Sequence, residues 1–240
     1  MGRIARVYSK TGIYHIIFRG MNKQDIFIEP HDYRKLADTI LNVKKDMGFE
    51  LYAYCFMSNH VHLVIKEKNE RDISLIMKRI LTKYVGWFNY KYGRSGALIE
   101  NRYKSKPVEV DEYFLQLIKY VHRNPLKAGL VREIGQYLYS SYSEYMGDDG
   151  ITDTDFVLEM LSVDDFVKLH NEEDMIEFTA TGRKRKPDDE VKMDLRIRYN
   201  IADPEEIIER TDKEKIISEL KTYCSARQIE RITGISRKKI

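Results

Sequence analysis

The order of the elements expected between residues 13 and 124 is the strongest constraint on what this chain can fold into. Runs rich in Ile, Phe and Tyr predict strands, and amphipathic runs between them predict helices. In chain order we expect a strand at 13–19, a helix within 32–49, strands at 49–57 and 60–66, a helix at 73–93, a short strand at 107–110 and a helix at 111–124.

The sequence of strand, helix, strand, strand, helix, strand and helix matches a ferredoxin-like sandwich. The pair Ser58–Asn59 suits the turn between the second and third strands. The predicted fold class is therefore α+β: a ferredoxin-like antiparallel sheet with helices on one face, plus a C-terminal helical extension.

Charge divides the chain into blocks, although the formal net charge is only +3. Residues 1–132 carry a net charge of +11, residues 133–182 carry −12 and residues 183–240 carry +4. A basic block favours a polyanionic partner, because phosphate contacts supply most of the sequence-independent affinity for nucleic acid. Solvated helix faces would give the same count, so charge alone leaves both readings open.

Changes in composition predict three parts. Residues 1–146 are expected to form one domain, residues 147–203 an acidic and then basic helical connector, and residues 204–240 a small helical unit.

The two cysteines, Cys55 and Cys224, lie far apart in the sequence. Neither a disulfide framework nor a cysteine zinc site is expected from them, and a reducing compartment fits this usage. The first residues lack an apolar core of signal-peptide length, and no segment approaches the roughly 20 apolar residues of a membrane span. We expect a cytoplasmic protein without a membrane partner, associated with the nucleoid when bound to DNA.

His60 and His62 stand in a run, HVHLVIK, that is otherwise typical of a buried strand. Residues two apart in a strand point to the same face, so the two imidazoles lie side by side while Val61 and Leu63 point the other way. Two neutral imidazoles at this spacing can bind one divalent ion. A hydrogen-bonded pair of core or edge histidines is the ordinary alternative, and the motif alone does not exclude it.

The helix expected at 111–124 offers a candidate nucleophile. Its apolar stripe consists of Phe114, Leu117, Ile118 and Val121. Tyr120 lies off the centre of the stripe, and Asn124 follows on the same side if the helix continues past the boundary that Pro125 favours. A tyrosine beside a bound metal ion can attack a phosphodiester as the phenolate. Spacing alone does not exclude Tyr113.

Three segments, in their order and spacing, carry a family resemblance: YHIIFRGMNKQDIF, YCFMSNHVHLVI and GALIENRYKSKPVEVDEYFLQLIKYVHRNPLKAGLV. Together they resemble the HUH single-tyrosine transposases of the transposase IS200-like superfamily. Within that superfamily they are most similar to the branch of REP-associated tyrosine transposases. The resemblance covers residues 5–146.

This resemblance implies an activity and assigns roles. His60 and His62 match the histidines of the HUH motif, Tyr120 matches the catalytic nucleophile and Asn124 matches the third metal ligand. Such enzymes break and rejoin single-stranded DNA with Mg²⁺ or Mn²⁺, through a 5′-phosphotyrosine and a free 3′-OH, and recognise DNA hairpins. The implied partner is single-stranded DNA with a hairpin, and the implied state is a monomer or a homodimer.

Several polar side chains near this site are candidate contacts for phosphates or bases. They are Arg19, Asn22, Arg102, Lys104, Lys106, Arg123 and Lys127. For each of them a solvated surface position is an equal alternative. Two departures from the family pattern, Met21 within RGMN and Tyr139 in place of Trp, concern local DNA contacts and not the catalytic residues.

The C-terminal stretch SARQIERITGISRKKI has the pattern of a helix-turn-helix, with a helix through Ile232, a turn at Thr233–Gly234 and a second helix from Ser236. In that motif the second helix reads the major groove. The candidate contacts are Arg227, Gln228, Ser236, Arg237 and Lys238. Other short helical hairpins share the pattern.

Two functions of different classes remain from the sequence. One is a metal-dependent transposase or DNA nickase, and the other is a non-catalytic regulator that binds hairpin DNA. The presence of His60, His62, Tyr120 and Asn124 together favours the enzyme. A metal-dependent phosphodiesterase that uses water would need the histidines but not Tyr120.

Overall fold

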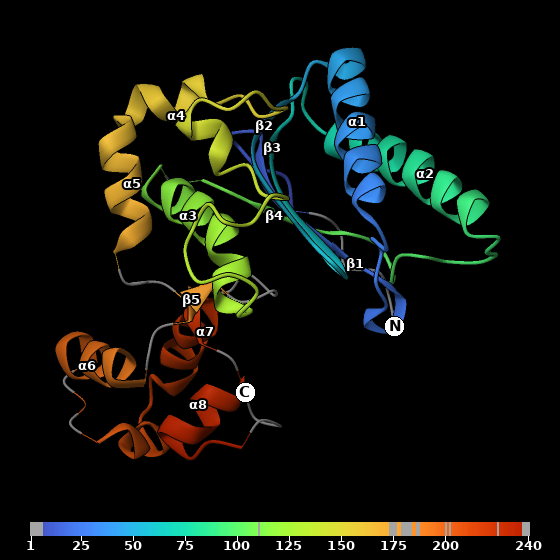
Figure 1. Cartoon of the computed structure of the whole chain (residues 1–240). Helices are drawn as coiled ribbons and strands as arrows, with labels where there is room; N and C mark the ends of the chain where they lie inside the picture. The colour runs from blue at the N-terminus through green and yellow to red at the C-terminus, as the bar shows by residue number, and fades with distance from the viewer. Residues whose placement is uncertain are drawn as a thin grey trace. The chain divides into compact units, whose positions relative to one another are not determined.

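The computed structural model describes residues 7–109, 111–172, 177–178, 184–185, 188–199, 201, 203–224 and 226–236. The chain divides into two compact units, Met1–Glu172 and Glu173–Ile240 (Figure 1). Among these described residues, no helix combines the length and the apolar character needed to cross a membrane.

A four-stranded antiparallel sheet forms the centre of the first unit. Its strands are β1 (Ile13–Arg19), β2 (Glu50–Met57), β3 (His60–Lys66) and β4 (Lys104–Pro107), in the order β2-β3-β1-β4. β3 lies between β1 and β2, and β4 pairs with the other edge of β1. This is the ferredoxin-like arrangement, so the predicted fold class is confirmed.

Helices α1 (Pro30–Met47) and α2 (Ile73–Lys91) cover one face of the sheet (Figure 1). The core between these layers contains Tyr14, Ile16 and Phe18 of β1, Val61, Leu63 and Ile65 of β3, Leu36, Ile40 and Val43 of α1, and Ile76, Ile80 and Phe88 of α2. α1 ends at Gly48, whose φ of 68° suits a residue without a Cβ. Alternate residues of the two central strands therefore supply this core.

Helix α3 (Asp111–Lys127) lies on the opposite face of the sheet (Figure 1). Its predicted apolar stripe is buried, and the ring of Phe114 packs against that of Tyr52 with centroids 5.3 Å apart. The expectation of helices on one face thus holds for α1 and α2, whereas α3 covers the other. Both faces need cover because β1 is buried along almost its whole length.

Two element boundaries differ from the prediction. The last strand is Lys104–Pro107 and not 107–110, because alternating lysines on one face gave this edge strand a polar appearance. α3 continues past Pro125 to Lys127. Pro125 has no N–H for the carbonyl of Val121, and the Asn124 side-chain amide approaches that carbonyl at 3.3 Å instead.

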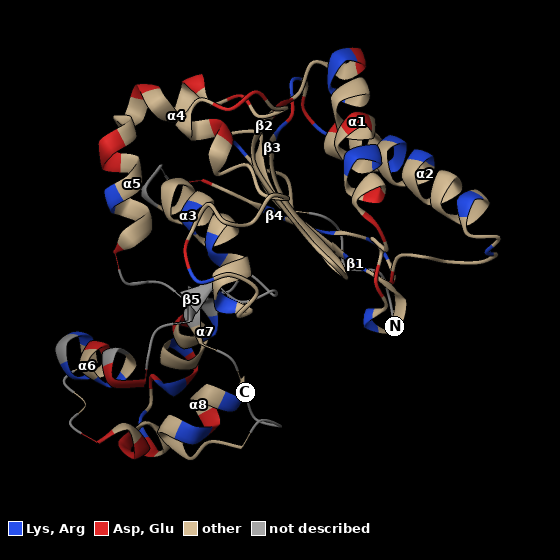
Figure 2. Cartoon of the chain, viewed as in Figure 1, with Lys and Arg blue, Asp and Glu red and all other residues tan. Residues whose placement is uncertain are grey.

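The chain after α3 packs back on the first unit. It forms η2 (Ser143–Met146), α4 (Asp155–Met160) and α5 (Val163–Asn171), and Figure 2 marks the Asp and Glu positions of α4 and α5 in red. The N–H of Asp153 donates to the carbonyl of Leu51 at 2.8 Å, and the Leu51 N–H donates to the Asp153 carboxylate at 2.7 Å. Residues 147–172, expected in a connector, therefore belong to this unit because they bond to the edge of β2.

Four polar groups link α3, β2 and α5 through buried hydrogen bonds. His170 Nδ1 donates to the Phe166 carbonyl at 2.8 Å, which leaves its Nε2 as the acceptor for His122 Nδ1 at 2.9 Å. His122 Nε2 then accepts from the Ser141 hydroxyl at 2.8 Å, and Ser141 Oγ accepts from the Tyr54 N–H at 2.9 Å. This histidine chain has one consistent order of donors and acceptors.

The second unit contains β5 (Glu177–Phe178), β6 (Lys184–Arg185), α6 (Asp188–Tyr199), η3 (Pro204–Glu209), α7 (Lys213–Tyr223) and α8 (Ala226–Thr233). Its core consists of Val191, Leu195, Ile207, Ile216, Leu220, Ile229 and Ile232. α6 thus belongs with the helices that follow it, and the unit begins before the predicted residue 204.

Helix α8 corresponds to the first helix of the candidate helix-turn-helix and ends before Gly234, with φ of 71°. Gln228 is buried and donates to Asp188 at 2.9 Å, so its side-chain amide bonds within this unit. Arg227 and Ser236 are exposed. Arg237 and Lys238 lie outside the described residues.

Replacing Ser141 with Ala tests the histidine chain. The change leaves His122 Nε2 and the Tyr54 N–H without their partner in a buried site, which is expected to lower the free energy of unfolding by about 1–3 kcal/mol in urea denaturation. Ser95→Ala, at an exposed loop position, should stay within about 0.5 kcal/mol of wild type. Equal effects of the two substitutions would contradict the assignment.

Candidate active site

The register of the sheet places three polar rows on the face that meets α3. One row joins Lys104, Ile17, His62 and Cys55, a second joins Lys106, His15, Val64 and Ala53, and a third joins Arg19, His60 and Met57. His60 and His62 therefore lie side by side as the spacing predicted, with ring centroids 5.1 Å apart.

His62 is almost completely buried and contacts a third histidine. Its Nδ1 lies 3.0 Å from His15 Nε2, and the two rings stack with centroids 5.3 Å apart. Burial lowers the pKa of His62 well below 6.5, and the nearby His15, His60 and Arg19 lower it further. Burial, aided by Lys106, lowers the pKa of His15 to about 3. Both rings are neutral at physiological pH.

His60 stands nearer the surface, at the start of β3. Its Nδ1 lies 2.7 Å from the side-chain oxygen of Asn59, which fixes this nitrogen as the donor and leaves Nε2 with a lone pair. Burial, followed by the charge of Arg19, lowers the pKa of His60 to about 4. A neutral imidazole of this tautomer is a competent metal ligand.

Tyr120 projects from α3 onto the histidines. Its ring meets His62 edge-on at a centroid distance of 5.6 Å and His15 at 6.0 Å. Burial raises the pKa of the Tyr120 phenol to about 12, and a hydrogen bond with Asn124 and the charge of Arg19 act in the opposite direction. The phenol is protonated at neutral pH, so its use as a nucleophile needs help with proton removal.

The side chain of Asn124 is oriented by the backbone of α3. Its Nδ2 donates to the Tyr120 carbonyl at 2.8 Å and approaches the Val121 carbonyl at 3.3 Å. Because a carbonyl can only accept, the NH₂ group of the Asn124 amide faces these two carbonyls. The Asn124 Oδ1 atom is then the one left for a ligand. The sequence prediction that Asn124 shares a side with Tyr120 holds because α3 continues through Pro125.

His60, His62 and Asn124 would offer two imidazole nitrogens and one amide oxygen, a set of donors that suits a divalent ion with open positions for substrate. Among the described residues, no group of three or more His, Cys, Asp or Glu side chains could hold a metal ion.

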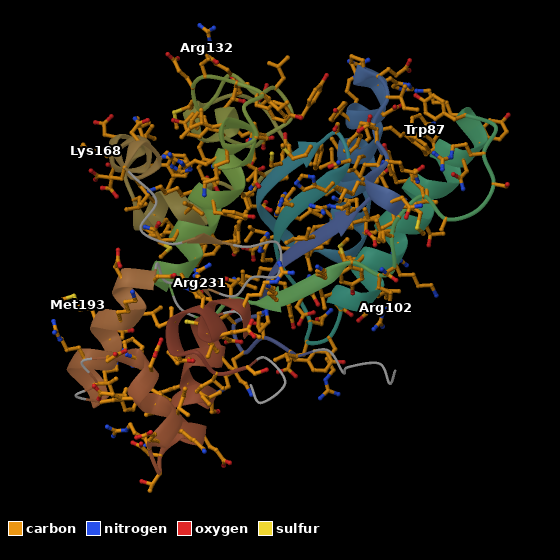
Figure 3. All side chains as sticks on the ribbon, turned by 90° about the horizontal axis from the view of Figure 1, so that it is seen from below. Trp87, Arg102, Arg132, Lys168, Met193 and Arg231 are labelled. Atoms are coloured by element: carbon orange, nitrogen blue, oxygen red, sulfur yellow. The ribbon has the colours of Figure 1, made fainter. Side chains whose placement is uncertain are left out.

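The predicted DNA contacts fall into different settings. Lys104 and Lys106 extend from β4 on the histidine face, Arg19 pairs with His60, and the Lys127 ammonium lies 5.3 Å from the centre of the Tyr120 ring. Asn22 and Arg102 are exposed, and Figure 3 marks Arg102 close to β4.

Arg123, one of the predicted DNA contacts, bonds to the end of α5. Its guanidinium donates to the carbonyls of His170 at 2.7 Å and Glu172 at 2.9 Å, at the C-terminal end of α5. It satisfies carbonyls that a helix end leaves unpaired, which is a structural use of the charge.

Sequence reasoning missed His15. The signal was present, since His15 is the one polar residue between Ile13 and Phe18 in a strand that is otherwise apolar or aromatic. Its neighbour His62 is far away in sequence, and only the pairing of β1 with β3 brings them together.

Comparisons with known proteins agree with this geometry. Residues 8–124 match the family model described as transposase IS200 like. Over these residues the chain is similar to IS200-like transposases. The family consists of DNA-processing transposases, and its model ends at Asn124, so it contains the histidine pair and Tyr120.

Two further similarities extend over more of the chain. A REP-associated tyrosine transposase of Escherichia coli (strain K12) is 20% identical over 143 residues, which are 59% of this chain and 83% of that protein. A solved structure of a REP-associated tyrosine transposase bound to a REP hairpin superposes with a TM-score of 0.53 at 20% identity, covering 64% of this chain and 94% of that one. The structural likeness supports the fold.

The buried histidines predict an acid-sensitive fold. Their pKa values are lowered in the folded state, so the unfolded chain binds more protons below its ordinary histidine pKa of 6.5. Stability should be constant just above pH 6.5 and fall towards pH of about 4, by roughly 1.4 kcal/mol per pH unit for each such histidine. Urea denaturation across this range measures the slope.

His122→Phe provides the control for that measurement. Removing one buried histidine should make the slope below pH 6.5 shallower by roughly 1.4 kcal/mol per pH unit, whatever the variant's absolute stability. A wild-type stability that does not change over this interval would contradict the assignment of neutral, buried rings.

Proposed function

We propose that this protein breaks and rejoins single-stranded DNA in a metal-dependent reaction through a 5′-phosphotyrosine at Tyr120, as a member of the REP-associated branch. The observation that carries the proposal is the meeting of Tyr120 with His62, at 5.6 Å between ring centroids, on the face of the sheet that also presents His60. Packing of the core does not require a tyrosine and two imidazoles from distant segments to meet on this face.

The proposed reaction is an exchange of one phosphodiester for another. The Tyr120 phenolate oxygen attacks the phosphorus of the scissile phosphate, and the bond from phosphorus to the 3′ oxygen breaks. The products are a 5′-phosphate attached to Tyr120 and a 3′ oxygen, which takes up a proton to become a free 3′-OH. Because one ester bond replaces another, the reverse attack by a 3′-OH rejoins a strand without an external energy source.

Residues of this chain would prepare each partner for that exchange. His60, His62 and Asn124 would hold a Mg²⁺ or Mn²⁺ ion, which when bound polarises the phosphate oxygens. The charge of Arg19 favours the phenolate of Tyr120, against the larger effect of burial, which favours the phenol. Lys127, next to the same ring, adds a positive charge where negative charge develops.

The proposed substrate is a hairpin formed by single-stranded DNA. The similar solved structure contains a REP hairpin, and the basic residues of this chain near the site suit a phosphate backbone. Lys104 and Lys106 extend the polar face beyond the histidines and give a strand a path along β4. The proposal for this substrate includes a bound Mg²⁺ or Mn²⁺ ion and a 5′-phosphotyrosine intermediate.

A regulator that binds hairpin DNA without cutting it is the second candidate. At 20% identity to the REP-associated relative, a chain can have the same fold and basic face without the cleavage activity. The two candidates differ in whether a covalent complex forms.

Replacing Tyr120 with Phe is expected to abolish the covalent complex. Wild-type protein, incubated with a labelled single-stranded hairpin and Mn²⁺, should give a band that survives a denaturing gel, and Tyr120→Phe should give none. Tyr113→Phe, on the same helix and the alternative nucleophile from spacing, should retain the band. Cleavage without a covalent band, unchanged in Tyr120→Phe, would favour a water nucleophile, and binding alone would favour the regulator.

Replacing Asn124 with Ala is expected to remove metal-dependent cleavage while sparing DNA binding. Loss of an oxygen ligand should lower the cleavage rate by about 100-fold or more, in line with removal of a group that stabilises transition-state charge. Hairpin affinity in the presence of a chelator should change little, because the contact concerns the metal. A cleavage rate within a few-fold of wild type would contradict the role of Asn124 as a ligand.

A further inference from the structure

We infer that His15 is a positioning residue for His62: it accepts a hydrogen bond from His62 Nδ1–H and thereby directs the lone pair of His62 Nε2 towards the metal ion. The inference rests on the proposed metal site and extends it to a strand that sequence reasoning did not implicate. The observation behind it is the 3.0 Å separation of His62 Nδ1 from His15 Nε2.

The chemistry of a neutral imidazole makes this pairing directional. A neutral ring has one N–H and one lone pair, so a ring that donates through Nδ1 must present its lone pair at Nε2. Ligating histidines in proteins almost always donate their other N–H to a fixed acceptor, which sets the tautomer and the ring orientation. In this chain the acceptor is another imidazole, where a carboxylate or a carbonyl is more usual.

His15 is held where it can serve as that acceptor. It is 1% exposed at the centre of β1, between the rows of Arg19 and Ile13, and stacks on His62 at 5.3 Å. Its second nitrogen, Nδ1, is buried and has no hydrogen-bond partner. An unsatisfied buried polar atom costs stability, so folding alone favours an apolar side chain at this position.

A similar buried pair of histidines links α3 and α5, which gives a matched comparison. His122 and His170 also form a buried pair, with nitrogens 2.9 Å apart, but both nitrogens of each ring have partners. That pair has a complete structural role. The pair in the active site differs from it, because His15 Nδ1 is buried without a hydrogen-bond partner, so this pair carries a cost in stability that the His122–His170 pair avoids.

His15→Leu and His15→Gln separate positioning from packing. Gln can place its side-chain oxygen near the position of His15 Nε2 and accept from His62, whereas Leu cannot accept. We expect His15→Leu to lower the affinity for Mn²⁺ by about 10- to 100-fold and His15→Gln to restore most of it. The melting temperature of His15→Leu should stay close to that of wild type, because the change removes the unpaired His15 Nδ1 but leaves His62 Nδ1 without its partner.

Electron paramagnetic resonance of Mn²⁺, titrated with the full chain with and without a single-stranded hairpin, measures the affinity independently of cleavage. His122→Leu is the control: it should lower the melting temperature and leave the Mn²⁺ affinity unchanged. If the wild-type protein binds Mn²⁺ and His62→Ala does not, but His15→Leu binds as tightly as wild type, the role of His15 alone would be overturned. A wild-type protein that binds no Mn²⁺, or whose binding survives His62→Ala, would overturn the metal site and this inference together.

Discussion

The structure depends on the two-residue alternation of the central strands β1 and β3. Odd and even positions of these strands face different environments: Val61, Leu63 and Ile65 enter the core under α1 and α2, while His60 and His62 face α3. A shift of one residue in the β1–β3 register would exchange the two sets. The apolar core therefore fixes the position of the polar site, and the site needs no separate scaffold.

Helix α3 joins the site to the remainder of the first unit. Tyr120 and Asn124 lie on the side of the histidines, and His122 belongs to the chain of hydrogen bonds that ends on α5. Because Pro125 removes a backbone donor inside this helix, the amide of Asn124 bonds to the helix carbonyls and acquires a fixed orientation. Residues 133–182, the block with a net negative charge, contribute to the site through His170 and Ser141. Both bond to His122 on the side of α3 away from the sheet histidines.

The parts of this account that follow from local periodicity could be predicted from the sequence. Alternation gave the shared face of His60 and His62, and helical spacing gave the common side of Tyr120 and Asn124. The parts that depend on contacts between distant segments could not. His15 meets His62 only through strand pairing, Arg123 is used by the end of α5, and Gln228 is buried by Asp188 of α6. The sequence pattern also placed β4 too late in the chain, because its lysines, on the face of the site, made the strand look polar.

The proposed reaction requires a metal ion that His60, His62 and Asn124 would hold near Tyr120. Anomalous diffraction from crystals grown with Mn²⁺ and a single-stranded hairpin tests it most directly. The account predicts one anomalous peak, bonded to His60 Nε2, His62 Nε2 and Asn124 Oδ1, with a DNA phosphate between the ion and Tyr120. A peak elsewhere on the chain, or a phosphate bound on the histidine face with no ion beside it, would contradict the account.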